Sequence, residues 1–478
     1  MAKTISLKVR RPAVAGSFYP DDPMQLKSMV ESFLSCEVKP ISENIFGILV
    51  PHAGYVYSGA TAGKSFSLIK NKKFKTAIIL AISHRHSIRG AALYSGCSFA
   101  TPLDNVCVDK QLTQKLKDSS PLFEFNDNAH EEEHSIEVQL PFLQVINPDV
   151  KIVPILLNNR NLKVLREVGA QVGKIANEND AMVIISSDMA HYPPSDIAKK
   201  SDLSTLKALD IALQYQDPSY FELANKLILS RREPGLETTC CGETAIIAGL
   251  YCVMQQGAND FKLVDYTNSG STRGADTSAV VGYGAGAFVK SDNPENHFKL
   301  LESQREKLLR IARQSITYYL QYKTIEKLEL SEIPVFNVPA AVFVTLNKDG
   351  ALRGCIGDLQ AKNLLADEVN KFAVAAAFED SRFPELTEDE IEDINIEISI
   401  LSPLRSIKTP DEIKEKLHGV YVVQGARSGT YLPQVWEHFK TKKEFLNSLL
   451  HEKAGLGEDA LKNPKTKLFV YTVESFKE

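Results

Sequence analysis

Three histidines in this chain each follow a short apolar run that has the composition of a buried β-strand. The runs and their histidines are 46–50 with His52, 76–82 with His84, and 182–186 with His191. Imidazole binds transition metals and also exchanges protons near neutral pH. These residues are therefore candidates for metal ligands or for acid–base catalysis.

The elements that must position these histidines are predicted by the same apolar runs. Continuous apolar runs separated by longer helical patterns are typical of a mainly parallel or mixed sheet covered by helices on both faces. In an open α/β sheet the carboxyl ends of the strands line the ligand crevice. A single histidine after a strand is ordinary in a protein core, but three such histidines favour one shared site.

A pair of cysteines could complete such a site. Cys240 and Cys241 come just before a helical pattern that begins near Glu243. The start of a helix lowers the pKa of a thiol and favours the thiolate, which binds metals. The sequence leaves open whether Cys240, Cys241 or Glu243 would complete the coordination of the metal. Most cysteines in such positions are simply small buried residues, which is the alternative interpretation.

The stretch HEEEH, residues 130–134, matches the zinc-protease pattern H-E-x-x-H. That pattern requires a helix with both histidines on one face and Glu131 as general base. The stretch is strongly acidic and follows Asn-Asp-Asn-Ala, which is typical of a charged loop entering a helix. We therefore do not expect a metalloprotease, although His134 remains a candidate functional residue.

The overall composition excludes several other classes. The chain has 478 residues, a net charge of −5 and 44% hydrophobic residues, so it lacks the basic footprint of a nucleic-acid-binding protein. No apolar run reaches the roughly 18 residues that predict a membrane span. The seven cysteines are scattered, which predicts reduced thiols and a cytoplasmic location.

The chain divides into two predicted domains at a polar break, 290–297. An α/β domain precedes the break. A long amphipathic helical pattern, a hairpin turning at 348–350 and an alternating run at 394–402 follow it and predict an α+β domain.

The motifs of the first domain resemble the Memo family, whose fold is similar to that of the class III extradiol dioxygenases, enzymes that use non-haem iron. The motifs are PHAGYVYSG, SHRH, EHSIEVQLPFL, SSDMAHY and TCCGETAI, and the resemblance covers residues 9–289. It implies a metal site at His52, His84 and Cys241. It also implies that His191 transfers protons and that Asp188 and His134 line the same crevice. We expect a pocket for a small-molecule or modified-nucleoside substrate, lined by Tyr55, Tyr57 and Tyr192.

The resemblance favours iron as the bound ion. A thiolate in place of the carboxylate of the dioxygenases shifts the preference towards copper or zinc, so these remain alternatives.

The second domain, residues 297–478, resembles the AMMECR family through LRGCIGDL, AAAFEDSRFPEL, IEISILSPL and GARSGTYLPQVW. Together the two domains resemble two parts of the AmmeMemoRadiSam system, which implies a radical S-adenosylmethionine enzyme as partner. The candidate residues of this domain are Arg353, Cys355, Asp380, Arg382 and Arg427. The arginines could bind an anion or form surface ion pairs. Cys355 would need a nearby base to act as a nucleophile, and a small residue in a tight strand is the simpler interpretation.

These observations predict a metal-dependent oxidoreductase that acts with a radical enzyme. The alternatives are a non-catalytic binding or scaffold protein that recognises a peptide or partner, and a metal carrier.

Overall fold

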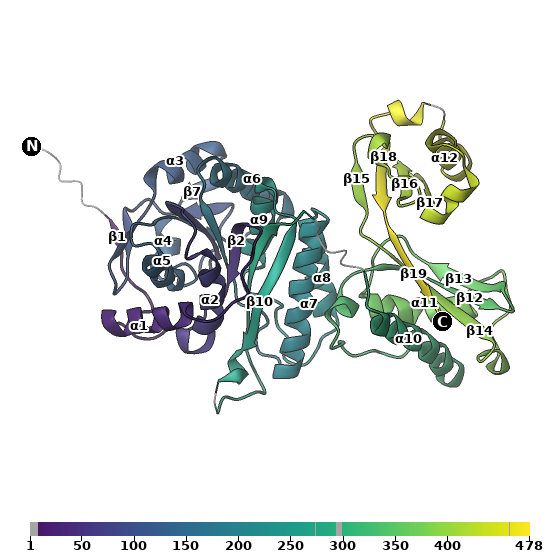
Figure 1. The fold of residues 1–478 in the computed structure, drawn as a ribbon, viewed down its shortest axis with the longest axis horizontal. Helices are drawn as coiled ribbons and strands as arrows, with labels where there is room; N and C mark the ends of the chain where they lie inside the picture. Colours follow the sequence, from purple (N-terminus) through teal and green to yellow (C-terminus); the bar gives the residue numbers. More distant parts are fainter. Residues whose placement is uncertain (1–7, 273, 293–298, 458) are drawn as a thin grey trace, which may run out of the picture. The chain divides into compact units, whose positions relative to one another are not determined.

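The computed structural model of the chain describes residues 8–272, 274–292, 299–457 and 459–478. The chain forms two compact units (Figure 1), one made of Met1–Glu295 with Leu330–Pro334 and the other of Asn296–Glu329 with Val335–Glu478. The polar break predicted at 290–297 lies mostly outside the described residues. No helix among the described residues is long and apolar enough to cross a membrane.

The first unit contains a mixed eight-stranded sheet with the order β10-β11-β2-β9-β3-β8-β4-β7. Its strands are β2 (Asn44–Val50), β3 (Thr76–Ile82), β4 (Ala91–Leu93), β7 (Phe123–Phe125), β8 (Lys151–Leu157), β9 (Met182–Ser186), β10 (Asp260–Asn268) and β11 (Gly282–Lys290). The central strands β2, β9, β3 and β8 are parallel to one another. The pairs β10/β11 and β11/β2 at one end and β4/β8 towards the other are antiparallel. The α/β fold predicted for this part of the chain is confirmed.

Helices surround this sheet. They are α1 (Pro23–Leu34), α2 (Tyr55–Ile69), α3 (Lys110–Ser119), α4 (Asp127–Glu131), α5 (Leu140–Ile146), α6 (Leu162–Glu178), α7 (Ser195–Gln214), α8 (Pro218–Ser230) and α9 (Glu243–Gln256). A small separate sheet contains β1 (Val9–Arg10), β5 (Ser98–Ala100) and β6 (Asn105–Cys107). Successive residues of a strand point to opposite faces of a sheet. Ile184 belongs to a core cluster that also contains Phe66 of α2, and its neighbour Ile185 packs against Gly249 of α9. Helices therefore cover both faces, which explains the continuous apolar runs.

The second unit contains two antiparallel four-stranded sheets, β13-β12-β14-β19 and β15-β18-β16-β17. The strands are β12 (Ala341–Lys348), β13 (Ala351–Gly357), β14 (Ile394–Leu401), β15 (Arg405–Ile407), β16 (Gly419–Gln424), β17 (Arg427–Tyr431), β18 (Lys467–Tyr471) and β19 (Val473–Lys477), and the helices are α10 (Glu302–Tyr322), α11 (Leu365–Phe378) and α12 (Lys442–Ser448). The predicted hairpin forms between β12 and β13, with positive φ angles at Asp349 (52°) and Gly350 (76°) that suit a tight hairpin turn. The predicted α+β class of this part is confirmed.

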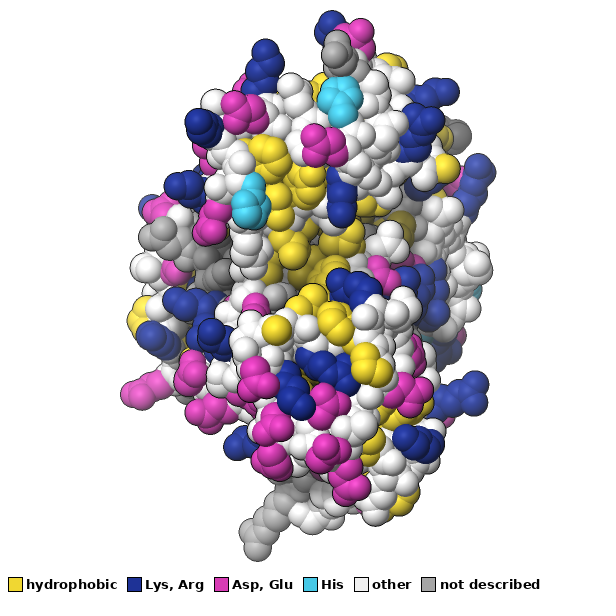
Figure 2. All heavy atoms as spheres, turned by 90° about the vertical axis from the view of Figure 1, so that its right-hand side faces the viewer, with side chains coloured by type: hydrophobic (Ala, Val, Ile, Leu, Met, Phe, Trp, Pro, Cys, Tyr) yellow, Lys and Arg dark blue, Asp and Glu magenta, His cyan; other side chains and the backbone are white. Residues whose placement is uncertain are grey.

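A hydrophobic cluster joins the two sheets of the second unit. Ala341, Leu401 and Tyr471 are buried at its centre, and partly buried side chains pack around them, namely Phe343, Leu359, Leu404, Tyr421, Leu432 and Val473. Figure 2 shows hydrophobic side chains gathered in a hollow on one face of the molecule.

Helices α6 and α9 approach each other closely because α6 carries two glycines at the contact. A Cβ atom on Gly173 would lie 2.4 Å from the carbonyl oxygen of Cys252, and one on Gly169 would lie 2.3 Å from that of Ala248. Neither position has room for a side chain, so these glycines set the distance between the two helices.

We expect Gly173→Val to lower the free energy of unfolding of the first unit by about 1–3 kcal/mol, because the added methyl groups force α6 and α9 apart. The neighbouring exposed Lys174→Ala is the control and should change it by less than about 0.5 kcal/mol. Urea denaturation followed by circular dichroism measures both. Equal stability of the two variants would contradict the proposed role of the glycine.

Candidate metal centre

The candidate centre lies at the carboxyl edge of the three central strands β2, β9 and β3. Val50 of β2 and Ala81 of β3 both pair with Ser186 of β9, so the loops after these strands begin side by side. His52 and His84 stand on two of these loops. The parallel register therefore brings together two histidines that are 32 residues apart in the sequence.

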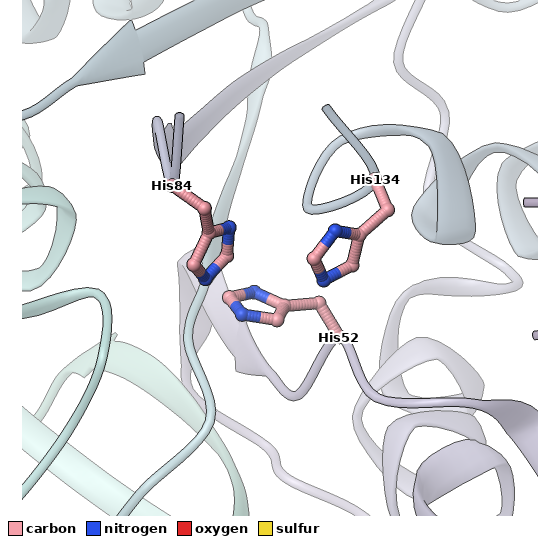
Figure 3. Close-up of side chains that lie close together, drawn as sticks. All are labelled: His52, His84 and His134. Carbon is pink, nitrogen blue, oxygen red and sulfur yellow. The ribbon is translucent and has the colours of Figure 1, made fainter. Parts of the chain in front are cut away.

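A third imidazole, that of His134, comes from the loop after α4. One ring nitrogen each from His52, His84 and His134 lies within 4.8 Å of the others, and the three rings point towards one another (Figure 3). The centroids of the His84 and His134 rings are 4.8 Å apart, and that of His52 is 5.3 Å from His84. His52 is buried, whereas His84 is exposed, so this group could hold a metal ion that solutes reach from the His84 side.

Ser186 determines which nitrogen of His52 is free to bind a metal. Its hydroxyl donates to the carbonyl oxygen of Ser135 at 2.7 Å, so the single proton of this hydroxyl is already used. The contact of 3.0 Å between His52 Nδ1 and Ser186 Oγ must then be a bond that Nδ1–H donates. Consequently, the Nε2 atom of His52 carries a lone pair.

Glu133 determines which nitrogen is free to bind a metal in the rings of His84 and His134. Its buried carboxylate accepts hydrogen bonds from the backbone N–H of His84 at 2.7 Å and from His84 Nδ1 at 2.9 Å, and it lies 3.5 Å from Nδ1 of His134. Burial opposes ionisation, but the hydrogen bonds from His84 outweigh it and hold the pKa of Glu133 well below its usual value. A carboxylate facing Nδ1 fixes the tautomer and leaves Nε2 for a metal.

The electrostatic environment keeps the imidazoles in the form that metals bind. Burial and the neighbouring rings of His134 and His84 lower the pKa of His52 well below its usual value. Burial also lowers the pKa of His134 to about 4, despite the opposing effect of Glu133. Both rings are therefore neutral at pH 7, and a neutral imidazole is the form that coordinates a metal.

Cys241 lies beside His52, at the start of α9. Its Sγ atom is 3.1 Å from His52 Nε2. Metal bonds of about 2.3 Å to sulfur and about 2.0 Å to nitrogen at a tetrahedral angle would separate the two ligand atoms by roughly 3.5 Å. The observed distance is therefore within a few tenths of an ångström of a pair that shares one ion, and the residues fit a bound metal.

The surroundings of Cys241 change its expected pKa, and they distinguish it from Cys240 and Glu243 as a candidate ligand. Burial and the charge of Asp188 raise the pKa of the Cys241 thiol, so they outweigh the helix start that was expected to lower it. Cys240 is buried, and Glu243 accepts a hydrogen bond from Asn225 at 3.1 Å. Of the three groups left open by the sequence, Cys241 is the one that contacts His52.

Asp188 connects the loops after β2 and β9. Its carboxylate accepts from the backbone N–H of His52 at 2.7 Å, and its other oxygen lies 4.0 Å from His52 Nε2. Burial raises the pKa of Asp188 to about 7, although hydrogen bonds from the backbone of His52 and Ala53 oppose this. Asp188 therefore positions the His52 loop and also places a carboxyl group next to the candidate centre.

His191 lies on a segment held firmly at the same edge. The N–H of Ala190 donates to the buried carboxylate of Asp202 at 2.8 Å, and that of Tyr192 donates to the carbonyl of Val280 at 2.8 Å. Tyr192 has a φ of 71°, a strained conformation that these bonds maintain. Within the described part of the chain, the buried Nε2 atom of His191 has no hydrogen-bond partner.

The three tyrosines expected to line a pocket have different positions. Tyr55 is 3% exposed and its hydroxyl donates to the carbonyl of Val138 at 2.7 Å, so it belongs to the core and not to a pocket. Tyr57 and Tyr192 are about half exposed, at 49% and 53%. The ring of Tyr192 packs edge-on against His191 with centroids 5.6 Å apart.

The HEEEH stretch does not form a zinc-protease site. Helix α4 ends at Glu131, and the buried His130 points its Nε2 atom at the carbonyl of Ala92, 3.1 Å away. Of the two histidines of this stretch, His134 is the one that reaches the candidate centre. Sequence reasoning missed Glu133 and Ser186, and the signal available for Glu133 was an acidic residue directly before a candidate ligand.

The candidate residues of the second unit are engaged in ion pairs and backbone hydrogen bonds. Arg353 binds Glu390 at 2.9 Å and Arg382 binds Asp380 at 2.7 Å, while Arg427 donates to the carbonyl of Gly455. Arg382 holds the pKa of Asp380 well below its usual value. The backbone N–H of Cys355 donates to Asp380, and its Sγ accepts from Thr345 at 3.2 Å. These contacts tie β13 to the turn after α11.

We expect Glu133→Gln to weaken binding of Zn²⁺ by about 10- to 100-fold, because the amide cannot accept from both the N–H and the Nδ1–H of His84 and the tautomer is no longer fixed. The exposed neighbour Glu132→Gln is the matched control and should bind Zn²⁺ like the wild type. Isothermal titration calorimetry measures the dissociation constants. If the two variants bind equally, Glu133 does not orient the ligands.

Comparison with known proteins identifies both parts of the chain. Residues 10–287 match the family model described as Memo-like protein, and residues 309–476 match the model described as AMMECR1. MEMO1 family proteins from Nitrosopumilus maritimus and Aquifex aeolicus are 34% and 36% identical to this chain, over 59% and 58% of its length and 100% and 98% of theirs. A solved structure, the uncharacterized protein PH0010 from Pyrococcus horikoshii, is 33% identical, with a TM-score of 0.34, over 38% of this chain and 94% of its own. Since the Memo-like model alone matches more than half of the sequence, the chain belongs to the Memo-like protein family, and it continues into an AMMECR1 domain.

Proposed function

We propose that this protein is a metal-dependent oxidoreductase and that it acts together with a radical S-adenosylmethionine enzyme. The observation that carries the proposal is the convergence of His52, His84 and His134, of which two have Nδ1 hydrogen-bonded so that Nε2 is free. Such a set of converging imidazoles is suited to a transition-metal ion.

Iron is the favoured ion, with copper or zinc as alternatives. A bound iron or copper ion would supply one-electron redox chemistry and a Lewis-acid site for a small organic substrate. His52 and His84 would hold it, with Cys241 or His134 as a further ligand. The thiol favours softer ions such as copper(I), whereas the nearby carboxyl group of Asp188 favours iron.

The residues around the centre have separate tasks in this proposal. His191 would donate or accept the proton that the reaction moves, because its Nε2 atom is buried and has no partner among the described residues. Asp188 holds the His52 loop through the backbone. Tyr57 and Tyr192 offer exposed aromatic rings to a flat substrate.

A metal carrier is the second candidate. The specific observation in its favour is the Cys241 thiol next to His52, since a thiol and an imidazole suit copper(I) and zinc ions that a carrier delivers without turnover.

Elemental analysis of protein purified without added metal tests the site. We expect His52→Ala and His84→Ala to retain about a tenth or less of the wild-type metal, because each removes a direct ligand. His86→Ala, an exposed histidine of the same loop, is the control and should retain it fully. Comparing Cys241→Ala with His134→Ala identifies the further ligand.

Two results would contradict the proposal in different ways. If neither His52→Ala nor His84→Ala loses metal, both the oxidoreductase and the carrier fail. If metal is lost but the wild type consumes no oxygen with catechol-type compounds, oxygen-dependent ring chemistry fails and the carrier remains.

The partnership is tested by capture of the radical enzyme from the same organism on the immobilised full-length chain. The AMMECR1 domain is expected to contribute, so the Aquifex aeolicus relative is the control, because its 280 aligned residues account for 98% of its length. We expect capture by the two-domain chain and at least about tenfold weaker capture by the relative. No capture by either would contradict the partnership, and equal capture would contradict the role of residues 297–478.

A further inference from the structure

A cavity of about 760 Å³ lies directly beside the candidate metal centre. Its lining includes His134, Phe18, Arg85, Glu132 and the segment 8–14. Of the three imidazoles of the centre, that of His134 belongs to this lining. Its volume is within the range of roughly 300–1,000 Å³ that is typical of small-molecule sites.

One wall of the cavity is held rigidly by the buried ion pair of Arg10 and Glu137. Both side chains are fully buried, and Glu137 also accepts from the backbone N–H of Ala13 at 2.8 Å. Arg10 donates in addition to the carbonyl oxygens of His130, at 2.9 Å, and Glu133, at 2.6 Å. The segment 8–14 is therefore fixed to the loop that carries His134, and the cavity wall does not depend on flexible side chains.

One cationic residue of the cavity lining has no ion-pair partner. Four cationic side chains line it, and three of them have carboxylate partners: Lys8 with Asp127 and Glu131, Arg10 with Glu137, and Arg85 with Glu132. Arg11, which is exposed, has no carboxylate partner among the residues that the structure describes. Since Glu131 and Glu132 are already paired with Lys8 and Arg85, the N–H donors of Arg11 remain available to a ligand.

Part of the cavity lining is apolar. The ring of Phe18 packs edge-on against that of His134 with centroids 4.9 Å apart, and Val9, Pro12 and Val14 line the same cavity. A ligand would therefore place an apolar or aromatic portion near His134 and an anionic group near Arg11.

We propose that this cavity binds the substrate of the metal centre and that the substrate is a small molecule with an anionic group, a carboxylate or a phosphate, recognised by Arg11. The inference rests on the proposed function of the centre. The guanidinium of Arg11 offers paired N–H donors that match either anion. The reactive portion of the substrate lies next to His134, through which the cavity adjoins the centre.

The test compares two probes that differ by one carboxylate, catechol and 3,4-dihydroxybenzoate, on iron-loaded full-length protein. We expect the wild type to bind 3,4-dihydroxybenzoate about tenfold more tightly than catechol, because only the former reaches Arg11. Arg11→Ala should remove this preference and leave the dissociation constant of catechol unchanged, while Arg11→Lys should restore part of it. Arg160→Ala, an exposed arginine outside the cavity lining, is the matched control and should keep the preference.

Inorganic phosphate added as a competitor separates the two anions. Displacement of 3,4-dihydroxybenzoate from the wild type at lower concentrations than from Arg11→Ala supports a phosphate-bearing substrate, and no displacement supports a carboxylate. If catechol binds but 3,4-dihydroxybenzoate binds no more tightly, the inference is wrong and the proposed function stands. If neither compound binds, the proposed function fails as well.

Discussion

The parallel pairing of β2, β9 and β3 is the constraint on which the candidate centre depends. Each strand is buried on both faces, so a shift of its register by one residue would exchange the side chains that face the two helical layers. The register that satisfies the core also aligns Val50, Ser186 and Ala81. The loops that follow must then share one edge, and their polar residues meet without any local sequence signal. The strand register that packs the core is therefore also the register that brings the site residues together.

Buried polar groups then convert this proximity into defined chemistry. Ser186 and Glu133 each accept a bond that decides which nitrogen of a neighbouring imidazole carries the proton, and Asp188 accepts from the backbone N–H of His52. A buried carboxylate is costly unless it is fully hydrogen-bonded, so Glu133 stabilises the fold only while His84 and Ser135 donate to it. The same bonds that offset its burial orient His84. Stability and ligand orientation are therefore coupled at this residue.

The sequence predicts the α/β and α+β classes and the strand ends that carry His52, His84 and His191, because apolar runs depend on local composition. The acidic HEEEH stretch favoured a loop over a helix with two ligands, and the resemblance implied that His134 lines the crevice, but neither predicted that His134 would join His52 and His84 as a candidate ligand. The structure decides this by burying His130 against the carbonyl of Ala92. Tyr55 was misplaced for a similar reason: its motif lies next to His52, but the first turn of α2 directs its ring into the core. Contacts between distant segments, such as Glu133 with His84, leave no periodic pattern to read.

The acidic loop after α4 explains why the centre and the cavity belong together. Glu133 and Glu137 are four residues apart and serve different neighbours: Glu133 holds the ring of His84, and Glu137 holds Arg10 and the backbone of the segment 8–14. His134 stands between them in the sequence and contacts both the other imidazoles and the cavity. A displacement of this loop would move a candidate ligand and a cavity wall at once. Because Arg10 also donates to the backbone carbonyl of Glu133, one guanidinium joins the carboxylate of Glu137 to the backbone of the loop that carries His134. The distance between the centre and the cavity is consequently fixed by buried ion pairs, which resist distortion more than an exposed loop would.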